Sequence, residues 1–188
     1  MTTKPQLRIL AFAGSLRRES FNRSLLRAAK ELAPADMAIE IYDLIDVPLY
    51  NGDVEAKGDP APVAAFKQAV RTADAVLIVT PEYNHGLPAV TKNAVDWLSR
   101  PPGKPPLDGK PVGILGASPG IVGTARAQDQ LRQVLVNTAS FCMPHPEVLV
   151  FKAHEKFDAA GKLTDEKTRE YIVKHLTALA AWTRRFVA

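Results

Sequence analysis

The chain has 188 residues, a formal net charge of +4 and a sequence pI near 9.2. Its hydrophobic fraction of 46% and charged fraction of 23% are those of a globular domain that buries a core of its own, which excludes a low-complexity chain. The Lys and Arg residues are scattered with no aromatic-basic stripe, so the mild excess of base favours small anionic ligands and excludes nucleic acid as the expected partner.

Cys142 is the single cysteine, which excludes an internal disulfide and a zinc site built on paired cysteines. The histidines show no metal-ligand spacing, so no metal is expected. No apolar run reaches the ~20 residues of a membrane span, and residues 1–8 lack the apolar core of a signal peptide. We therefore expect one domain over residues 1–188, in the cytoplasm and without a membrane partner.

Apolar, strand-like runs alternate with amphipathic runs from the start of the chain. Residues 7–13 form the first apolar run, and apolar residues at helical spacing predict a helix over about 22–32. A second, more exposed strand is expected at 37–42. A long loop follows over 43–62, and because such loops are uncommon unless they are functional or disordered, we expect it to shape the rim of a pocket.

The later elements continue the alternation, with helices at 63–72, 88–98, 124–138 and 165–186 and strands at 75–79, 112–117 and 148–151. Residues 75–79 are the purest apolar run, as expected for a central strand covered on both faces. Five strands and five helices in this order predict an α/β fold with a doubly wound, five-stranded parallel sheet of the flavodoxin-like kind, with helices on both faces.

Three unusual loops follow strands of this predicted sheet, at 14–22, 81–86 and 118–123. Open parallel sheets bind ligands outside the carboxyl ends of their strands, at the point where the strand order reverses. All three loops are polar and contain glycine. Their shared place at one edge of the sheet predicts a ligand site there.

The first loop has the chemistry of a phosphate site. Ser15, Ser20 and Asn22 carry neutral polar groups, and Arg17 or Arg18 offers a guanidinium suited to phosphate oxygens. The start of a helix adds free backbone N–H groups. The loop lacks the G-x-G-x-x-G of dinucleotide folds and the Gly-Lys-Ser/Thr of P-loops, which leaves a single terminal phosphate or, alternatively, an ordinary capped turn.

The other two loops are suited to a planar ring. Residues 81–84 combine a rigid proline, an aromatic ring and amide groups, and such a turn can present backbone groups to the edge of a heterocycle. Gly120 lets the backbone of the third loop approach a ligand closely. The alternatives are a tight turn capped by Asn84 and a simple hinge at 118–120.

Two other chemistries are excluded by missing residues. No G-x-S-x-G nucleophile elbow is present, which argues against a hydrolase. A phospho-accepting receiver domain needs acidic residues after its first strand and an Asp after its third, where this chain has Gly14-Ser15 and Thr80-Pro81.

The sequence resembles the NADPH-dependent FMN reductases, most nearly their bacterial chromate and quinone reductase branch. Four segments carry the resemblance: Gly-Ser-Leu-Arg-x-x-Ser-Phe-Asn at 14–22, Pro-Glu-Tyr-Asn at 81–84, the run at 92–100, and the Gly-x-Ala-Arg stretch at 123–126. The resemblance covers nearly the whole chain. His85 and the 118–120 segment depart from the pattern expected beside the ring.

The resemblance implies a single FMN with NADPH or NADH as hydride donor. The residues that it places around this cofactor are Ser15, Leu16, Arg17, Arg18, Ser20, Phe21, Asn22, Pro81, Glu82, Tyr83, Asn84, His85, Ser118 and Gly120. It also implies a homodimer or homotetramer, with Glu82 and Arg126 in the place of a pair that contributes to tetramer contacts.

The activity that follows is a transfer of hydride from NAD(P)H through flavin N5 to a small-molecule electron acceptor such as a quinone, a flavin, an azo dye or chromate. The flavin supplies this chemistry, so we assign no catalytic side chain. Two alternatives are a flavodoxin-type electron carrier, disfavoured by the basic charge, and a non-catalytic flavin-binding assembly module.

Overall fold

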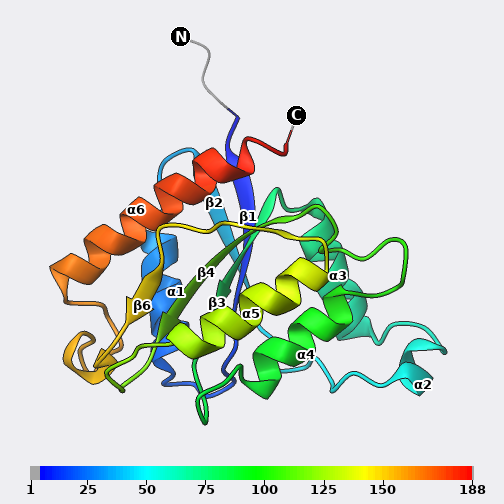
Figure 1. Ribbon diagram of the computed structural model, residues 1–188, viewed down its shortest axis with the longest axis horizontal. Helices are drawn as coiled ribbons and strands as arrows, with labels where there is room; N and C mark the ends of the chain where they lie inside the picture. Colours follow the sequence, from blue (N-terminus) through cyan, green and yellow to red (C-terminus); the bar gives the residue numbers. More distant parts are fainter. Residues whose placement is uncertain (1–4, 188) are drawn as a thin grey trace.

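A parallel sheet lies between two layers of helices in the computed structural model, which describes residues 5–187 (Figure 1). Every strand pair is parallel. The strands are β1 (Leu7–Ala13), β2 (Met37–Tyr42), β3 (Ala75–Val79), β4 (Pro111–Ala117), β5 (Phe141–Cys142) and β6 (Val148–Val150). The helices are α1 (Phe21–Glu31), α2 (Gly52–Glu55), α3 (Ala61–Thr72), α4 (Ala89–Leu98), α5 (Ala125–Asn137), α6 (Glu166–Thr183) and a short 3-10 helix at Ala153–Glu155.

The strand order β2-β1-β3-β4-β5 confirms the predicted doubly wound, flavodoxin-like sheet. The fifth position is filled by two short strands rather than one. β5 pairs with the beginning of β4 (Pro111 with Phe141) and β6 with its end (Leu115 with Val148). The sequence pattern missed β5 because it spans two residues, neither of them buried.

Alternating side chains of the strands build a core on each face of the sheet. Ile9 and Ala11 of β1 pack in the core beneath α1 and α6, whereas Leu10 and Phe12 pack in the core beneath α3, α4 and α5. All five residues of β3 are buried, as its apolar sequence predicts for a strand covered on both sides. No helix among residues 5–187 is both long and apolar enough to cross a membrane.

The order of the strands places the three loops together. β1 lies between β2 and β3, so the chain passes from β1 to β2 on one side of it and then returns to β3 on the other, and the strand order reverses at this point. The loops after β1, β3 and β4 follow three neighbouring strands of one parallel sheet, and their carboxyl ends share one edge. The expected meeting of these loops is thereby confirmed.

Candidate functional site

The first loop ends in a capped helix whose positive end is not neutralised. Ser20 has an extended backbone, and its Oγ accepts a hydrogen bond from the Asn22 N–H (3.2 Å). No acidic residue occupies the first turn of α1. The 11-residue helix therefore begins with free N–H groups and partial positive charge facing the loop.

The rest of this loop is rich in unused hydrogen-bond donors. Within residues 5–187, the backbone N–H groups of Leu16, Arg17 and Arg18 bond to no protein acceptor, and neither of the two guanidinium groups forms an ion pair. All three side chains are exposed, whereas Ser15 and Ser20 are buried. Buried hydroxyls, free amides and free guanidinium groups together are the donor set that a phosphate ester requires.

Asn22 joins the first loop to the end of β4. Its Nδ2 donates to the Ala117 carbonyl (2.9 Å), and its Oδ1 accepts from the Ala117 N–H (2.9 Å). Both polar atoms of this buried amide are thus occupied within the protein. Phe21, one residue earlier, packs against the core with its ring centroid 5.7 Å from that of Phe157. The structure gives both side chains a positioning role at the start of α1.

The second loop is a tight, strained turn. Tyr83 and Gly86 exchange backbone hydrogen bonds (3.2 and 3.0 Å) around Asn84 and His85, whose φ angles are 50° and 62°. Positive φ at both central residues is the geometry of a type I′ turn, and it is strained for His. Asn84 and His85 are exposed, and the Tyr83 side chain is 53% exposed, so the turn offers its groups to a ligand instead of packing on the core. Pro81, before the turn, is buried.

A side-chain contact links the first two loops. The Ser15 Oγ and the Tyr83 hydroxyl are 3.4 Å apart, across 68 residues of sequence. Behind this contact, Gly14 lies so close to α4 that a Cβ on it would stand 1.8 Å from Thr91 Oγ1. The glycine is therefore required for the loop to pack against the helix.

Glu82 links the second loop to α5. Its carboxylate accepts from the backbone N–H groups of Arg126 (3.0 Å) and Ala127 (3.2 Å) and forms an ion pair with the Arg126 guanidinium (3.3 Å). Thr124, the N-cap residue of α5, makes no side-chain cap of its own. Glu82 therefore caps α5 from another segment, and the Glu82–Arg126 pair expected at a subunit contact forms within one chain.

The first residues of the third loop are held by hydrogen bonds. The Ser118 N–H donates to the Val150 carbonyl (2.9 Å), and the Gly120 N–H donates to the Ser118 Oγ (3.1 Å). Gly116, just before the loop, would bring a Cβ within 1.9 Å of Thr124 Oγ1. Gly120 itself is exposed, and a Cβ placed on it would meet no atom nearer than the Ser118 Oγ at 3.5 Å, so a ligand can approach its Cα closely.

The long loop after β2 is ordered by α4, a role that sequence reasoning did not assign. Asn93 accepts from the Tyr50 N–H (2.8 Å) and donates to the Pro48 carbonyl (2.9 Å), which also accepts from the Trp97 indole (2.8 Å). The Tyr50 hydroxyl donates a hydrogen bond to Glu55. This bond is the main reason why the pKa of Tyr50 is raised above its usual value. Asn93 and Trp97 are four residues apart and therefore lie on one face of the predicted helix. This spacing is the sequence signal from which their role could have been inferred.

This loop forms an apolar groove beside the first loop. The groove has a volume of about 170 Å³ and is lined by Leu16, Leu44, Val47, Leu49, Ala89, Val90, Asn93 and Ala94. Outside this groove, the exposed Asp43 carboxylate accepts a hydrogen bond from Arg23, which holds the pKa of Asp43 below its usual value. The expectation that this loop shapes a pocket rim agrees with this geometry.

Comparison with known proteins gives a consistent result. A protein-family model described as NADPH-dependent FMN reductase matches residues 7–155. An NAD(P)H-dependent FMN reductase of Pseudomonas aeruginosa is 49% identical over 95% of this chain and 96% of its own length. A 2-hydroxy-1,4-benzoquinone reductase of Burkholderia sp. is 43% identical, over 95% of this chain and 97% of its own length.

Solved structures agree as well. The flavoenzyme FerB, an NAD(P)H:(acceptor) oxidoreductase from Paracoccus denitrificans, superposes with a TM-score of 0.87 at 34% identity, over 96% of this chain and 98% of that one.

Proposed function

This chain belongs to the NADPH-dependent FMN reductase family and is an FMN-dependent NAD(P)H oxidoreductase, and we propose that quinones are its electron acceptors. We also propose that the three loops described above hold the FMN. The observation that carries the proposal is the contact between Ser15 and Tyr83, because it brings a phosphate-type donor set beside a turn that offers an exposed aromatic ring.

The phosphate end of FMN would be held by the first loop. Its free N–H groups at Leu16 to Arg18, the Ser15 and Ser20 hydroxyls and the start of α1 supply neutral donors and partial positive charge. Arg17 and Arg18 add charged donors that no acid of the described chain occupies. Asn22 takes part by holding this helix start against β4.

The ring of FMN would be held by the other two loops. The 81–86 turn offers the Tyr83 ring and the backbone of Asn84 and His85. Ser118 and Gly120 lie on the third loop, which can approach the ring closely at Gly120 because that residue has no side chain. Bound FMN supplies the hydride chemistry between nicotinamide and acceptor. The chain's residues bind and orient it, and preorganised N–H donors favour negative charge on the ring. No side chain of the site is needed as an acid or base.

Two observations favour quinones among the acceptors. Quinone reduction is the activity in the name of the Burkholderia relative. In addition, the groove beside Leu16 is apolar, and its one amide, Asn93, is already bonded at both polar atoms. A neutral ring suits such a surface better than an anion such as chromate, because no free donor there replaces the anion's water. Flavins and azo dyes remain acceptors to be compared.

A homodimer or homotetramer is proposed for the assembly. Leu49, which lines this groove, is 76% exposed, and Ile45 on the same loop is 55% exposed; apolar residues this exposed, when they lie together, commonly mark contact surfaces. Light scattering after size exclusion measures the assembly directly. A monomer at micromolar concentration contradicts this part of the proposal.

The function is tested on the purified protein. We expect a yellow protein that retains FMN and oxidises NADPH rapidly only when a quinone is present. A protein that holds FMN but is not bleached by NADPH in a stopped-flow experiment is an electron carrier, and a colourless protein that takes up no FMN is an assembly module. Either result contradicts the proposal. Steady-state rates with quinone, free flavin, azo dye and chromate rank the acceptors.

A further inference from the structure

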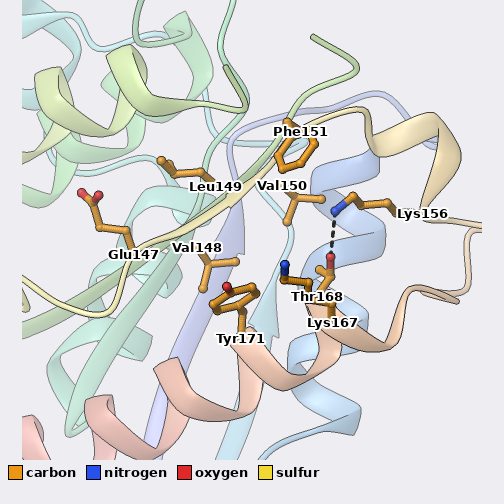
Figure 2. A pocket seen from close by; sticks show the side chains of 9 residues that line it. All are labelled: Glu147, Val148, Leu149, Val150, Phe151, Lys156, Lys167, Thr168 and Tyr171. Atoms are coloured by element: carbon orange, nitrogen blue, oxygen red, sulfur yellow. Dashed lines mark hydrogen bonds between the residues drawn. The ribbon is translucent and has the colours of Figure 1, made fainter. Parts of the chain in front are cut away.

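A second cavity lies beside the edge strand β6, apart from the groove described above (Figure 2). Its volume is about 380 Å³. It is bounded by β6, by the segment that follows β6 and by the first turns of α6 (Figure 2). The lining residues are Glu147, Val148, Leu149, Val150, Phe151, Lys156, Lys167, Thr168 and Tyr171.

Two aromatic rings border an apolar floor in this cavity. Figure 2 shows Phe151 and Tyr171 on opposite sides of Val148 and Val150. Phe151, directly after β6, is 46% exposed, and Tyr171, in α6, is 45% exposed. Exposed aromatic rings beside apolar side chains are suited to stacking on a planar base.

The cavity also has an excess of positive charge. The Lys156 ammonium lies 4.5 Å from the Phe151 ring centroid and is shared with Thr168 (3.3 Å) and Asp165 (3.5 Å). Lys167 has no acidic partner within residues 5–187. The one carboxylate in the lining, Glu147, lies 3.4 Å from Arg132, which offsets its charge. An anionic ligand is therefore favoured.

The cavity is connected to the proposed ring site through the backbone. The Lys152 N–H donates to the Gly120 carbonyl (3.0 Å), and the Ala153 N–H donates to the Ser118 carbonyl (3.0 Å). The segment that starts at Phe151 therefore forms one wall of the cavity and also braces the third loop. A ligand with one end at the third loop and a long, anionic remainder can follow this segment into the cavity.

We propose that this cavity binds the adenosine phosphate half of the nicotinamide donor, with the adenine against Phe151 and Tyr171 and the 2′-phosphate at Lys167. The proposal rests on the proposed function, because it places the nicotinamide end at the third loop. Of the groups that this enzyme must recognise, only the donor combines a purine with several phosphates. Since the 2′-phosphate is the one difference between NADPH and NADH, the free charge of Lys167 makes NADPH the preferred donor.

Adenosine 2′,5′-bisphosphate is the direct probe, added to the FMN-loaded protein in a titration calorimeter. We expect it to bind wild-type protein and to bind Lys167→Glu at least about tenfold more weakly, as for the loss of a charge-assisted contact. In Lys167→Glu the Michaelis constant for NADPH should also rise about tenfold. The Michaelis constants for NADH and for the quinone, and the rate at saturating donor, should change little. Tyr171→Ala should weaken both nucleotides alike.

Lys57→Glu is the matched control, because it makes the same charge change after α2, at the opposite side of the molecule from β6 (Figure 1). Lys167→Glu places an acid in the first turn of α6, which favours the helix, and a melting curve confirms that it folds. Equal binding of the bisphosphate to wild type and Lys167→Glu, or no binding to either, overturns the inference. A wild-type protein that binds the bisphosphate but does not oxidise NADPH contradicts the proposed function instead.

Discussion

Asn22 at the start of α1 and Ala117 at the end of β4 exchange two hydrogen bonds of 2.9 Å, although 95 residues separate them. Through this pair a side chain at the start of α1 bonds both backbone polar groups of the last residue of β4, which is also paired with Val150 of β6. The start of α1, where the phosphate of FMN is proposed to bind, is thus fixed to the strand that carries the third loop.

Replacing Asn22 with Ala should destabilise the protein. The change leaves the buried N–H and C=O of Ala117 without partners, so we expect the free energy of unfolding to fall by about 2–4 kcal/mol. Urea unfolding of the FMN-free protein measures it. Asn137→Ala, at the exposed end of α5, is the control. Equal unfolding midpoints for both variants contradict the positioning role.

Replacing Arg17 with Ala should weaken FMN binding without affecting the fold. The guanidinium is exposed and contributes nothing to the packing, so the loss should be about 1.5–3 kcal/mol in FMN binding free energy, the range for a hydrogen bond to a charged group. Fluorescence titration with FMN measures it, with Arg71→Ala on α3 as the control. Adding Ser20→Ala should weaken binding further and also remove the cap of α1. Unchanged FMN affinity in Arg17→Ala means that the phosphate binds elsewhere.

Replacing Glu82 with Ala should loosen the second loop. The carboxylate caps α5 through two backbone N–H groups and is nearly buried, so its loss should cost about 1–2 kcal/mol of stability. Glu170→Ala, on the exposed face of α6, should cost little. Thermal unfolding compares them. A melting temperature of Glu82→Ala equal to that of the control shows that the cap is not stabilising.

Stability should fall as the pH is lowered, because His175 is buried as a neutral ring. Burial lowers its pKa from 6.5 to about 4, its Nδ1 lies 2.7 Å from the Pro146 carbonyl, and its Nε2 has no partner among the described residues. The unfolded chain binds this proton first, so the stability is complete above pH 6.5 and is lost toward pH 4, by about 3 kcal/mol in all.

His175→Gln removes this titration and tests its origin. We expect the unfolding free energy of the variant to vary less between pH 7 and pH 5 than that of the wild type. The slope with pH is the quantity to compare, since the substitution itself changes the packing against Gly113 and Leu179. Parallel curves for the two proteins would show that another group controls the acid sensitivity.

Much of the fold could be predicted from the order of apolar residues. The run at 75–79 is entirely apolar, and it forms β3, which is buried on both faces. The sequence also predicted that the loops at 14–22, 81–86 and 118–123 meet, because the carboxyl ends of parallel strands share an edge whatever their exact order. The short elements β5 and α2 were missed, since two to four residues carry no periodicity.

The sequence by itself thus determined the chemical kinds of group at this edge of the sheet, namely hydroxyls, amides and guanidinium groups around a tyrosine. Only the tertiary structure decided which of them are free. Glu82 is bound to α5 and Asn22 to β4, whereas Arg17 and Arg18 remain available. The physical reason is that each of these hydrogen bonds joins residues 44 to 95 positions apart, and only folding brings such groups within bonding distance.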